Sequence, residues 1–190
     1  YSEKEDLISA KKLNLLLKRK NSKKEFENII KDKTVFIIGA GPSLSKSLKH
    51  IKKSKNIIKI VADGAVRALL EENIKPDILV TDLDGDLESI KKIGKTQTPI
   101  IVHAHGDNSE KLEIVKNISN VMGTTQTKKF GKLENFGGFT DGDRCVFLAE
   151  YFNANKIVLI GMDFGQKIGK YSKHKVTNRK IKIKKLKFGK

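Results

Sequence analysis

Two aspartates one residue apart, Asp82 and Asp84, directly follow the apolar run 78–81. In an extended segment, residues i and i+2 point to the same side, so both carboxylates can face one cation. Mg²⁺ prefers hard oxygen ligands, and a divalent ion also relieves the repulsion between neighbouring carboxylates. The spacing therefore predicts a magnesium site, and the alternative is an acidic turn closed by Gly85.

Polar residues follow other apolar runs in the same way. Asp63 and Gly64 come after the run 57–62, and the segment 103–108 (HAHGDN) closes the run that begins at Ile100. Ligands of an open parallel sheet bind beyond the carboxyl ends of its strands, so these segments are expected to share one rim. Asp107 is therefore the third candidate metal ligand. Asp63 is expected to be a fourth ligand or to contact a ribose or substrate group.

The histidines His103 and His105 also stand two residues apart. A two-histidine metal site is conceivable, but the surrounding carboxylates favour magnesium over zinc. We expect the pair to contact substrate or to support the metal ligands, with a structural role as the alternative. His105 or one of the aspartates is a candidate general base, although the chemistry does not require a dedicated base.

The segment 39–43 (GAGPS) follows the apolar run 35–38. Gly39 and Gly41 let backbone N–H groups approach a phosphate, and Ser43 can cap the next helix, whose positive end attracts anions. The segment lacks the lysine of a P-loop, and Leu44 occupies the last glycine position of a dinucleotide-binding motif. It predicts a phosphate contact, with a plain strand-to-helix turn as the alternative.

A second glycine-rich segment, 135–144 (NFGGFTDGDR), leads into a predicted helix. Glycine-rich loops are flexible and often carry function. Thr140 or Asp141 can cap the helix, and Arg144 can pair with a phosphate or with Asp143. A phosphate and a ribose together indicate a bound nucleotide. The residues expected to contact it are Gly39, Gly41, Ser43, Asp63, Gly64, Asn108, Thr140, Asp141 and Arg144.

Unbroken β-branched runs alternate with amphipathic stretches from Thr34 onward. This pattern predicts an α/β fold, a mostly parallel Rossmann-like sheet with helices on both faces. The expected strands are 35–38, 57–62, 78–81, 100–103, 119–122 and 157–160. The expected helices are 44–51, 66–72, 87–93, 110–118 and 143–152.

The flanks of this pattern differ from its centre. Two helices are predicted within residues 1–33, and each begins with a Ser-x-x-Glu capping box, at Ser2 and at Ser22. We expect these helices to pack on the main domain or on a second subunit. The second arrangement would make the protein a homodimer. Residues 34–165 form the expected catalytic domain. The basic segment 166–190 is expected to be a lid or an edge element.

The formal net charge of +17 invites a nucleic-acid interpretation. The lysines, however, fall on predicted helix faces and in the tail, and no recognition helix, zinc finger or aromatic RNA-binding motif is present. We therefore do not expect nucleic acid as the partner.

The single cysteine, Cys145, excludes an intramolecular disulfide and is expected to be buried. No apolar run is long enough for a membrane span and no signal peptide is recognisable, so a cytoplasmic protein is expected.

Several motifs in this order resemble the archaeal 6-hydroxymethyl-7,8-dihydropterin pyrophosphokinases, a family distantly similar to thiamin pyrophosphokinases. The matching segments are GAGPSL at 39–44, ADGA at 62–65, PD at 76–77 leading into TDLDG at 81–85, HAHGDN at 103–108 and GGFTDGDR at 137–144. In the thiamin enzymes a comparable Asp-x-Asp and a later Thr-Asp carry magnesium. The resemblance places these roles on Asp82, Asp84 and Asp107, although Gly106 replaces the threonine.

The resemblance implies transfer of a diphosphate from ATP to the hydroxymethyl group of a reduced pterin, with Mg²⁺ as cofactor and AMP as leaving group. The product would feed tetrahydromethanopterin or folate synthesis. Such a transfer depends mainly on positioning and charge neutralisation, which carboxylate-held magnesium and donor-rich loops supply. The alternatives are a metal-dependent nucleotide-sugar glycosyltransferase similar to sialyltransferases, and a non-catalytic nucleotide-binding domain.

Overall fold

The computed structural model describes residues 2–18, 23–164 and 167–172. Within them the chain forms a seven-stranded sheet of order β6-β5-β4-β3-β2-β1-β7, in which every pair of neighbours is parallel. The strands are β1 (Thr34–Ile38), β2 (Ile58–Ala62), β3 (Ile78–Thr81), β4 (Ile100–Ala104), β5 (Val121–Thr125), β6 (Leu133–Glu134) and β7 (Lys156–Ile160). The predicted α/β class and parallel sheet are confirmed.

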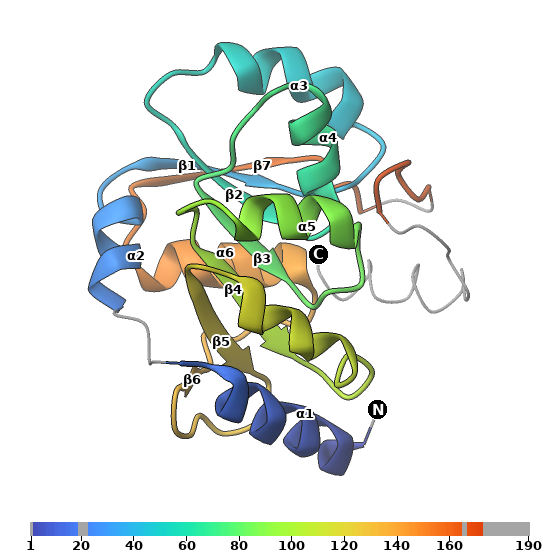
Figure 1. Ribbon diagram of the computed structural model, residues 1–190. Coiled ribbons are helices and arrows are strands. Elements are labelled where there is room, and N and C mark those ends of the chain that lie inside the picture. The colour runs from blue at the N-terminus through green and yellow to red at the C-terminus, as the bar shows by residue number, and fades with distance from the viewer. Residues whose placement is uncertain (1, 19–22, 165–166, 173–190) are drawn as a thin grey trace.

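The helices divide between the two faces of the sheet (Figure 1). They are α1 (Glu3–Leu16), α2 (Lys23–Ile30), α3 (Leu44–Lys53), α4 (Ala65–Glu71), α5 (Leu87–Gly94), the 3₁₀ helix η1 (Lys111–Asn117) and α6 (Asp141–Tyr151). From β1 to β5 each crossover steps in the same direction, so right-handed connections place α3, α4, α5 and η1 on one face. The return from β6 to β7 steps the other way and places α6 on the opposite face.

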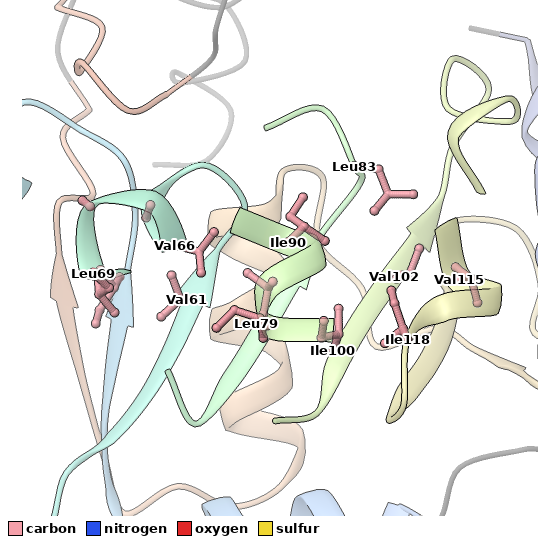
Figure 2. Close-up of a cluster of buried hydrophobic side chains, with 14 of the residues drawn as sticks. Val61, Val66, Leu69, Leu79, Leu83, Ile90, Ile100, Val102, Val115 and Ile118 are labelled. Carbon is pink, nitrogen blue, oxygen red and sulfur yellow. The ribbon is translucent and has the colours of Figure 1, made fainter. Parts of the chain in front are cut away.

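The core is double because side chains alternate along each strand. Val61, Leu79 and Ile100 point into the cluster beneath α4 and α5, which Figure 2 shows. Ile60 and Ile78, beside them in sequence, belong to the second cluster, against α2 and α6. Strands buried on both faces need apolar residues at every position, which explains the continuous apolar runs.

Helix α1 packs on the main sheet. Its Ala10 and Leu13 are fully buried in the same cluster as β4, and its Asp6 accepts a hydrogen bond from the Gly106 N–H at 2.8 Å. The capping box at Ser2 and Glu5 is confirmed, whereas Ser22 lies outside the described residues. The proposed division of the chain into segments and the homodimer stay predictions.

Some boundaries differ from expectation. The predicted helix 110–118 is a 3₁₀ helix, and the strand expected at 119–122 lies at Val121–Thr125. Strand β6 was not predicted, because two residues carry no readable period. Cys145 is buried as expected. No helix in the described part of the chain is both long and apolar enough to cross a bilayer. Most of the segment 166–190, expected to be a lid or an edge element, lies outside the described residues.

Candidate metal and substrate site

Three carboxylates gather beyond the carboxyl ends of β2 and β3. Asp63, Asp82 and Asp84 each offer an oxygen, and these oxygens all lie within 4.8 Å of one another, the one such group within the described residues. Hard oxygen ligands at this spacing suit a divalent cation such as Mg²⁺. The structure thus brings together three of the predicted acidic residues.

The Asp-x-Asp segment reaches this arrangement through a turn, which corrects the expectation of an extended segment. Leu83 has a φ of 66° and its side chain is fully buried. Its N–H donates to Thr81 Oγ1 at 2.9 Å, and the Asp84 N–H donates to Asp82 Oδ1 at 3.2 Å. A left-handed leucine is strained, by roughly 1–3 kcal/mol. Burial of Leu83 in the core holds the turn, and the turn directs both carboxylates to one side.

Asp63 is the most buried member of the cluster, with 7% of its surface exposed. Its Oδ1 accepts hydrogen bonds from Thr81 Oγ1 at 2.6 Å and from the Gly85 N–H at 3.3 Å. Burial, followed by the charges of Asp82 and Asp84, raises the pKa of Asp63 to about 8. The cluster is therefore electrostatically crowded, a condition that a bound divalent cation relieves.

A fourth carboxylate, Asp141, adjoins the cluster at the start of α6. Its Oδ2 lies 3.4 Å from the N–H of Asp82, and its Oδ1 accepts from Arg144 Nη1 at 3.1 Å. Burial, followed by the charge of Asp82, raises the pKa of Asp141 well above its usual value, although Arg144 opposes the shift. Asp143, the alternative to a phosphate as the partner of Arg144, is instead engaged by the N–H and hydroxyl of Thr140 in the helix cap.

Asp107 stands apart from the three-carboxylate group and pairs with His105. His105 Nδ1 lies 2.7 Å from Asp107 Oδ1, a contact that fixes the orientation of the imidazole. The neighbouring Asn108 is buried, and its amide donates to the carbonyls of Asp82 and His103 at 2.7 Å each. Asn108 thus ties the ends of β3 and β4 together. The metal-ligand role of Asp107 stays a prediction.

Gly39, Gly41 and Ser43 of the glycine loop after β1 already donate to acceptors within the protein. The N–H groups of Gly39 and Gly41 donate to the carbonyls of Ile160 and Gly161 at 2.8 and 2.7 Å. Ser43 donates through its N–H and its hydroxyl to Asp163 Oδ2, at 3.0 and 2.8 Å. Ser43 does not cap α3, because its own backbone is helical and its side chain is turned toward Asp163. A phosphate at this loop would have to displace that carboxylate, and the predicted phosphate contact stays untested.

Three residues support the site through contacts that the sequence alone could not assign. Thr81 holds both Asp63 and the Leu83 turn, Gly85 donates to Asp63, and Asp163 occupies the glycine loop. Thr81 was visible as a hydroxyl at the end of an apolar strand, but its two partners become apparent only when the strand ends are side by side. Gly64, at the start of α4, lies close to the backbone carbonyl of Tyr171.

Gly85→Ala is expected to weaken Mg²⁺ binding about tenfold or more, as loss of a group that orients a ligand typically does. A Cβ on Gly85 would lie 2.5 Å from Asp63 Oδ2 and 2.9 Å from its Cγ, so Asp63 must shift. Isothermal titration with MgCl₂ measures the effect. Gly94→Ala is the control, because it adds the same methyl at the far end of α5, 3.1 Å from Ile118 Cγ1. Equal Mg²⁺ affinities in the two variants would contradict the packing of Gly85 against Asp63.

Comparison with known proteins gives a consistent result. The model of the family described as 6-hydroxymethylpterin diphosphokinase MptE-like matches residues 10–169. A Methanocaldococcus jannaschii protein named 6-hydroxymethyl-7,8-dihydropterin pyrophosphokinase is 45% identical, over 100% of this chain and 86% of its own length. A Pyrococcus furiosus protein of the same name is 44% identical, over 99% of this chain and 83% of its own.

A solved structure shares the fold at low sequence identity. The MAf glycosyltransferase from Magnetospirillum magneticum AMB-1 superposes with a TM-score of 0.54 and 15% identity. The match covers 86% of this chain but only 28% of the glycosyltransferase chain. This likeness concerns the fold alone.

Proposed function

Because the chain belongs to the MptE-like family of 6-hydroxymethylpterin diphosphokinases, we propose that it catalyses Mg²⁺-dependent transfer of diphosphate from ATP to 6-hydroxymethyl-7,8-dihydropterin. The products are AMP and the pterin diphosphate, an intermediate for tetrahydromethanopterin or folate synthesis. The observation that supports the metal-dependent step is the convergence of Asp63, Asp82 and Asp84 at one rim of the sheet.

The chemistry of the site suits this reaction. The substrate hydroxyl oxygen attacks the β-phosphorus of ATP, the bond from that phosphorus to the α,β-bridging oxygen breaks, and AMP leaves. Bound Mg²⁺ would neutralise phosphate charge during this step. Asp82 and Asp84 would hold the ion, and Asp63 would join them once it has lost its proton. Asp107 stays a candidate ligand from the next strand end.

The proton of the substrate hydroxyl also needs an acceptor. His105 is the candidate, because its ring is fixed by Asp107 at 2.7 Å and lies on the segment after β4, beside the carboxylate rim. Phosphoryl transfer of this kind has little need of a strong base, so we expect His105 to contribute less than the carboxylates.

Incubation of the protein with ATP, MgCl₂ and 6-hydroxymethyl-7,8-dihydropterin tests the proposal. We expect AMP and pterin diphosphate in equal amounts by liquid chromatography, and neither product when EDTA removes the metal. A parallel incubation with a nucleotide sugar tests the glycosyltransferase alternative. Release of nucleotide from that sugar, together with no AMP from ATP and pterin, would overturn the proposed function. Nucleotide binding without turnover of either substrate would indicate the non-catalytic alternative.

A further inference from the structure

A small cavity lies between the sheet and α6, next to the carboxylate cluster. Its polar wall includes His103, Thr124 and Arg144, and its apolar wall includes Val80, Ile101 and Phe136. The cavity volume is about 10 Å³, which is room for about one water molecule, so a larger ligand can enter only if the wall of the cavity moves. None of the three clustered carboxylates lines this cavity, so the cavity is distinct from the candidate metal site.

Three polar atoms of this wall lack hydrogen-bond partners within the described residues. They are His103 Nε2, Arg144 Nε and Arg144 Nη2. Both residues are buried, His103 with 3% and Arg144 with 6% of its surface exposed. Buried polar groups are nearly always paired, and leaving one unsatisfied costs roughly 1–3 kcal/mol. Arg144 Nε and Nη2 lie on the same edge of the guanidinium and form a two-donor fork. The cavity therefore holds groups arranged to meet a ligand or ordered water.

The charge of the cavity disfavours a phosphate. Arg144 is already paired with Asp141 through Nη1 at 3.1 Å. Burial, with help from the Arg144 cation, lowers the pKa of His103 well below its usual value, while Gln126 opposes the shift, so the ring is neutral. With its one cation balanced and with apolar side chains opposite, the cavity suits a neutral planar ring better than a polyanion.

His103 can form a hydrogen bond with either a donor or an acceptor on a ligand. Its Nδ1 lies 3.0 Å from Thr124 Oγ1, and a threonine hydroxyl can donate or accept. His103 Nε2 can thus accept from a ring N–H or donate to a ring oxygen. The cavity offers two fixed donors from Arg144 and one adaptable nitrogen.

We propose that this cavity binds the bicyclic ring of the pterin, with the Arg144 fork donating to the ring carbonyl O4 and the ring nitrogen N5. This rests on the proposed function. O4 and N5 are neighbouring acceptors on one edge of the pterin, in the same arrangement as O6 and N7 of guanine, which arginine reads through a two-donor contact. Phe136 supplies an aromatic surface for the ring.

This placement also orients the reacting group. The hydroxymethyl substituent of the substrate is on C6, directly beside N5. The guanidinium that holds N5 is bonded on its other side to Asp141, whose second oxygen lies 3.4 Å from the backbone N–H of Asp82. With N5 bonded to Nη2 rather than to Nε, the hydroxymethyl group lies at the end of the guanidinium that also carries Nη1, the nitrogen bonded to Asp141. Entry of the ring requires the Phe136 segment to move, and Gly137 and Gly138, with φ of 91° and 90°, allow that movement.

Binding of 6-hydroxymethyl-7,8-dihydropterin and of its 5-deaza analogue, in which carbon replaces N5, tests the proposal by fluorescence titration. For the wild-type protein we expect about tenfold weaker binding of the analogue. Arg144→Lys keeps the charge but loses the fork. It is expected to bind the pterin roughly 10–100-fold more weakly and to distinguish the two ligands little.

Two results would overturn the assignment. One is equal affinity of the wild-type protein for pterin and analogue, a measurement that needs no substitution and so does not depend on the folding of the variant. The other is an Arg144→Lys protein that loses affinity for a non-hydrolysable ATP analogue but binds pterin normally, which would make the fork a phosphate contact. A wild-type protein that turns over the pterin yet fails the first test rejects only this pocket, whereas absence of turnover rejects the proposed function itself.

Discussion

Asp82→Asn is expected to lower kcat by about 10²–10³-fold, the usual cost of removing one preorganised charge-stabilising group. Asp82 is the central member of the cluster, because its charge raises the pKa of both Asp63 and Asp141. An asparagine keeps the Oδ1 that accepts from the Asp84 N–H, so the turn survives. Steady-state AMP release at saturating ATP and pterin measures the effect.

The same substitution should stabilise the protein when no metal is present. It removes a half-buried charge that opposes ionisation of Asp63 and Asp141, a gain on the order of 1 kcal/mol or about 2–4 °C in Tm. Loss of activity with a gain in stability is a signature that unfolding cannot imitate. A variant with unchanged kcat, or with a lower metal-free Tm, would contradict the electrostatic role of Asp82.

Two further variants define the comparison. Asp32→Asn is the matched control, since Asp32 is exposed at the amino end of β1 and has a φ of 59°, which asparagine tolerates. It should leave kcat and the metal-free Tm unchanged.

Asp107→Asn tests the third predicted ligand. A loss of Mg²⁺ affinity similar to that of Asp82→Asn would place Asp107 on the metal, and a smaller change in kcat alone would place it with His105.

The fold was largely predictable because its signal is local. Each strand of a sheet covered on both faces must be apolar at every position, so runs such as 78–81 are visible without knowledge of their neighbours. Strand β6 is different. Its two residues owe their conformation to pairing with β5, where Gly123 faces Leu133 and Thr124 faces Glu134. Such a strand has no pattern of its own.

The site was predictable only to the level of which strand ends meet. That rule predicted a shared rim for Asp63, Asp82 and Asp84, as the structure has them, but it did not predict that Asp107 stands outside the three-carboxylate group. It could not choose the partner of Arg144, because Asp141 and Asp143 are both close in sequence. The choice depends on the cap of α6, where Thr140 occupies Asp143 and leaves Asp141 to Arg144. Nor could it give Leu83 its positive φ, which follows from burial of that side chain.

The metal-free protein is expected to lose stability as pH rises from about 4 to about 8. In the unfolded chain Asp63 loses its proton near pH 4, whereas in the folded protein burial and the charges of Asp82 and Asp84 raise its pKa to about 8. Between these values the folded state binds one proton more than the unfolded state. The free energy of unfolding must therefore fall with pH, by up to about 1.4 kcal/mol per unit from this group. Urea unfolding across this range measures the slope.

Mg²⁺ should reverse this loss, and more strongly at high pH. The ion binds the carboxylate form, so it competes with the proton at Asp63, and its stabilisation should be larger at pH 8.5 than at pH 6. Asp63→Asn separates this residue from Asp141, whose pKa is also raised, because asparagine keeps the acceptor for Thr81 and Gly85 but cannot ionise. The variant should show a shallower decline of metal-free stability and a Mg²⁺ effect that depends less on pH. If its pH slope matched that of the wild type, the crowding of charge would reside elsewhere, and Asp63 could not be the residue that passes from proton to metal.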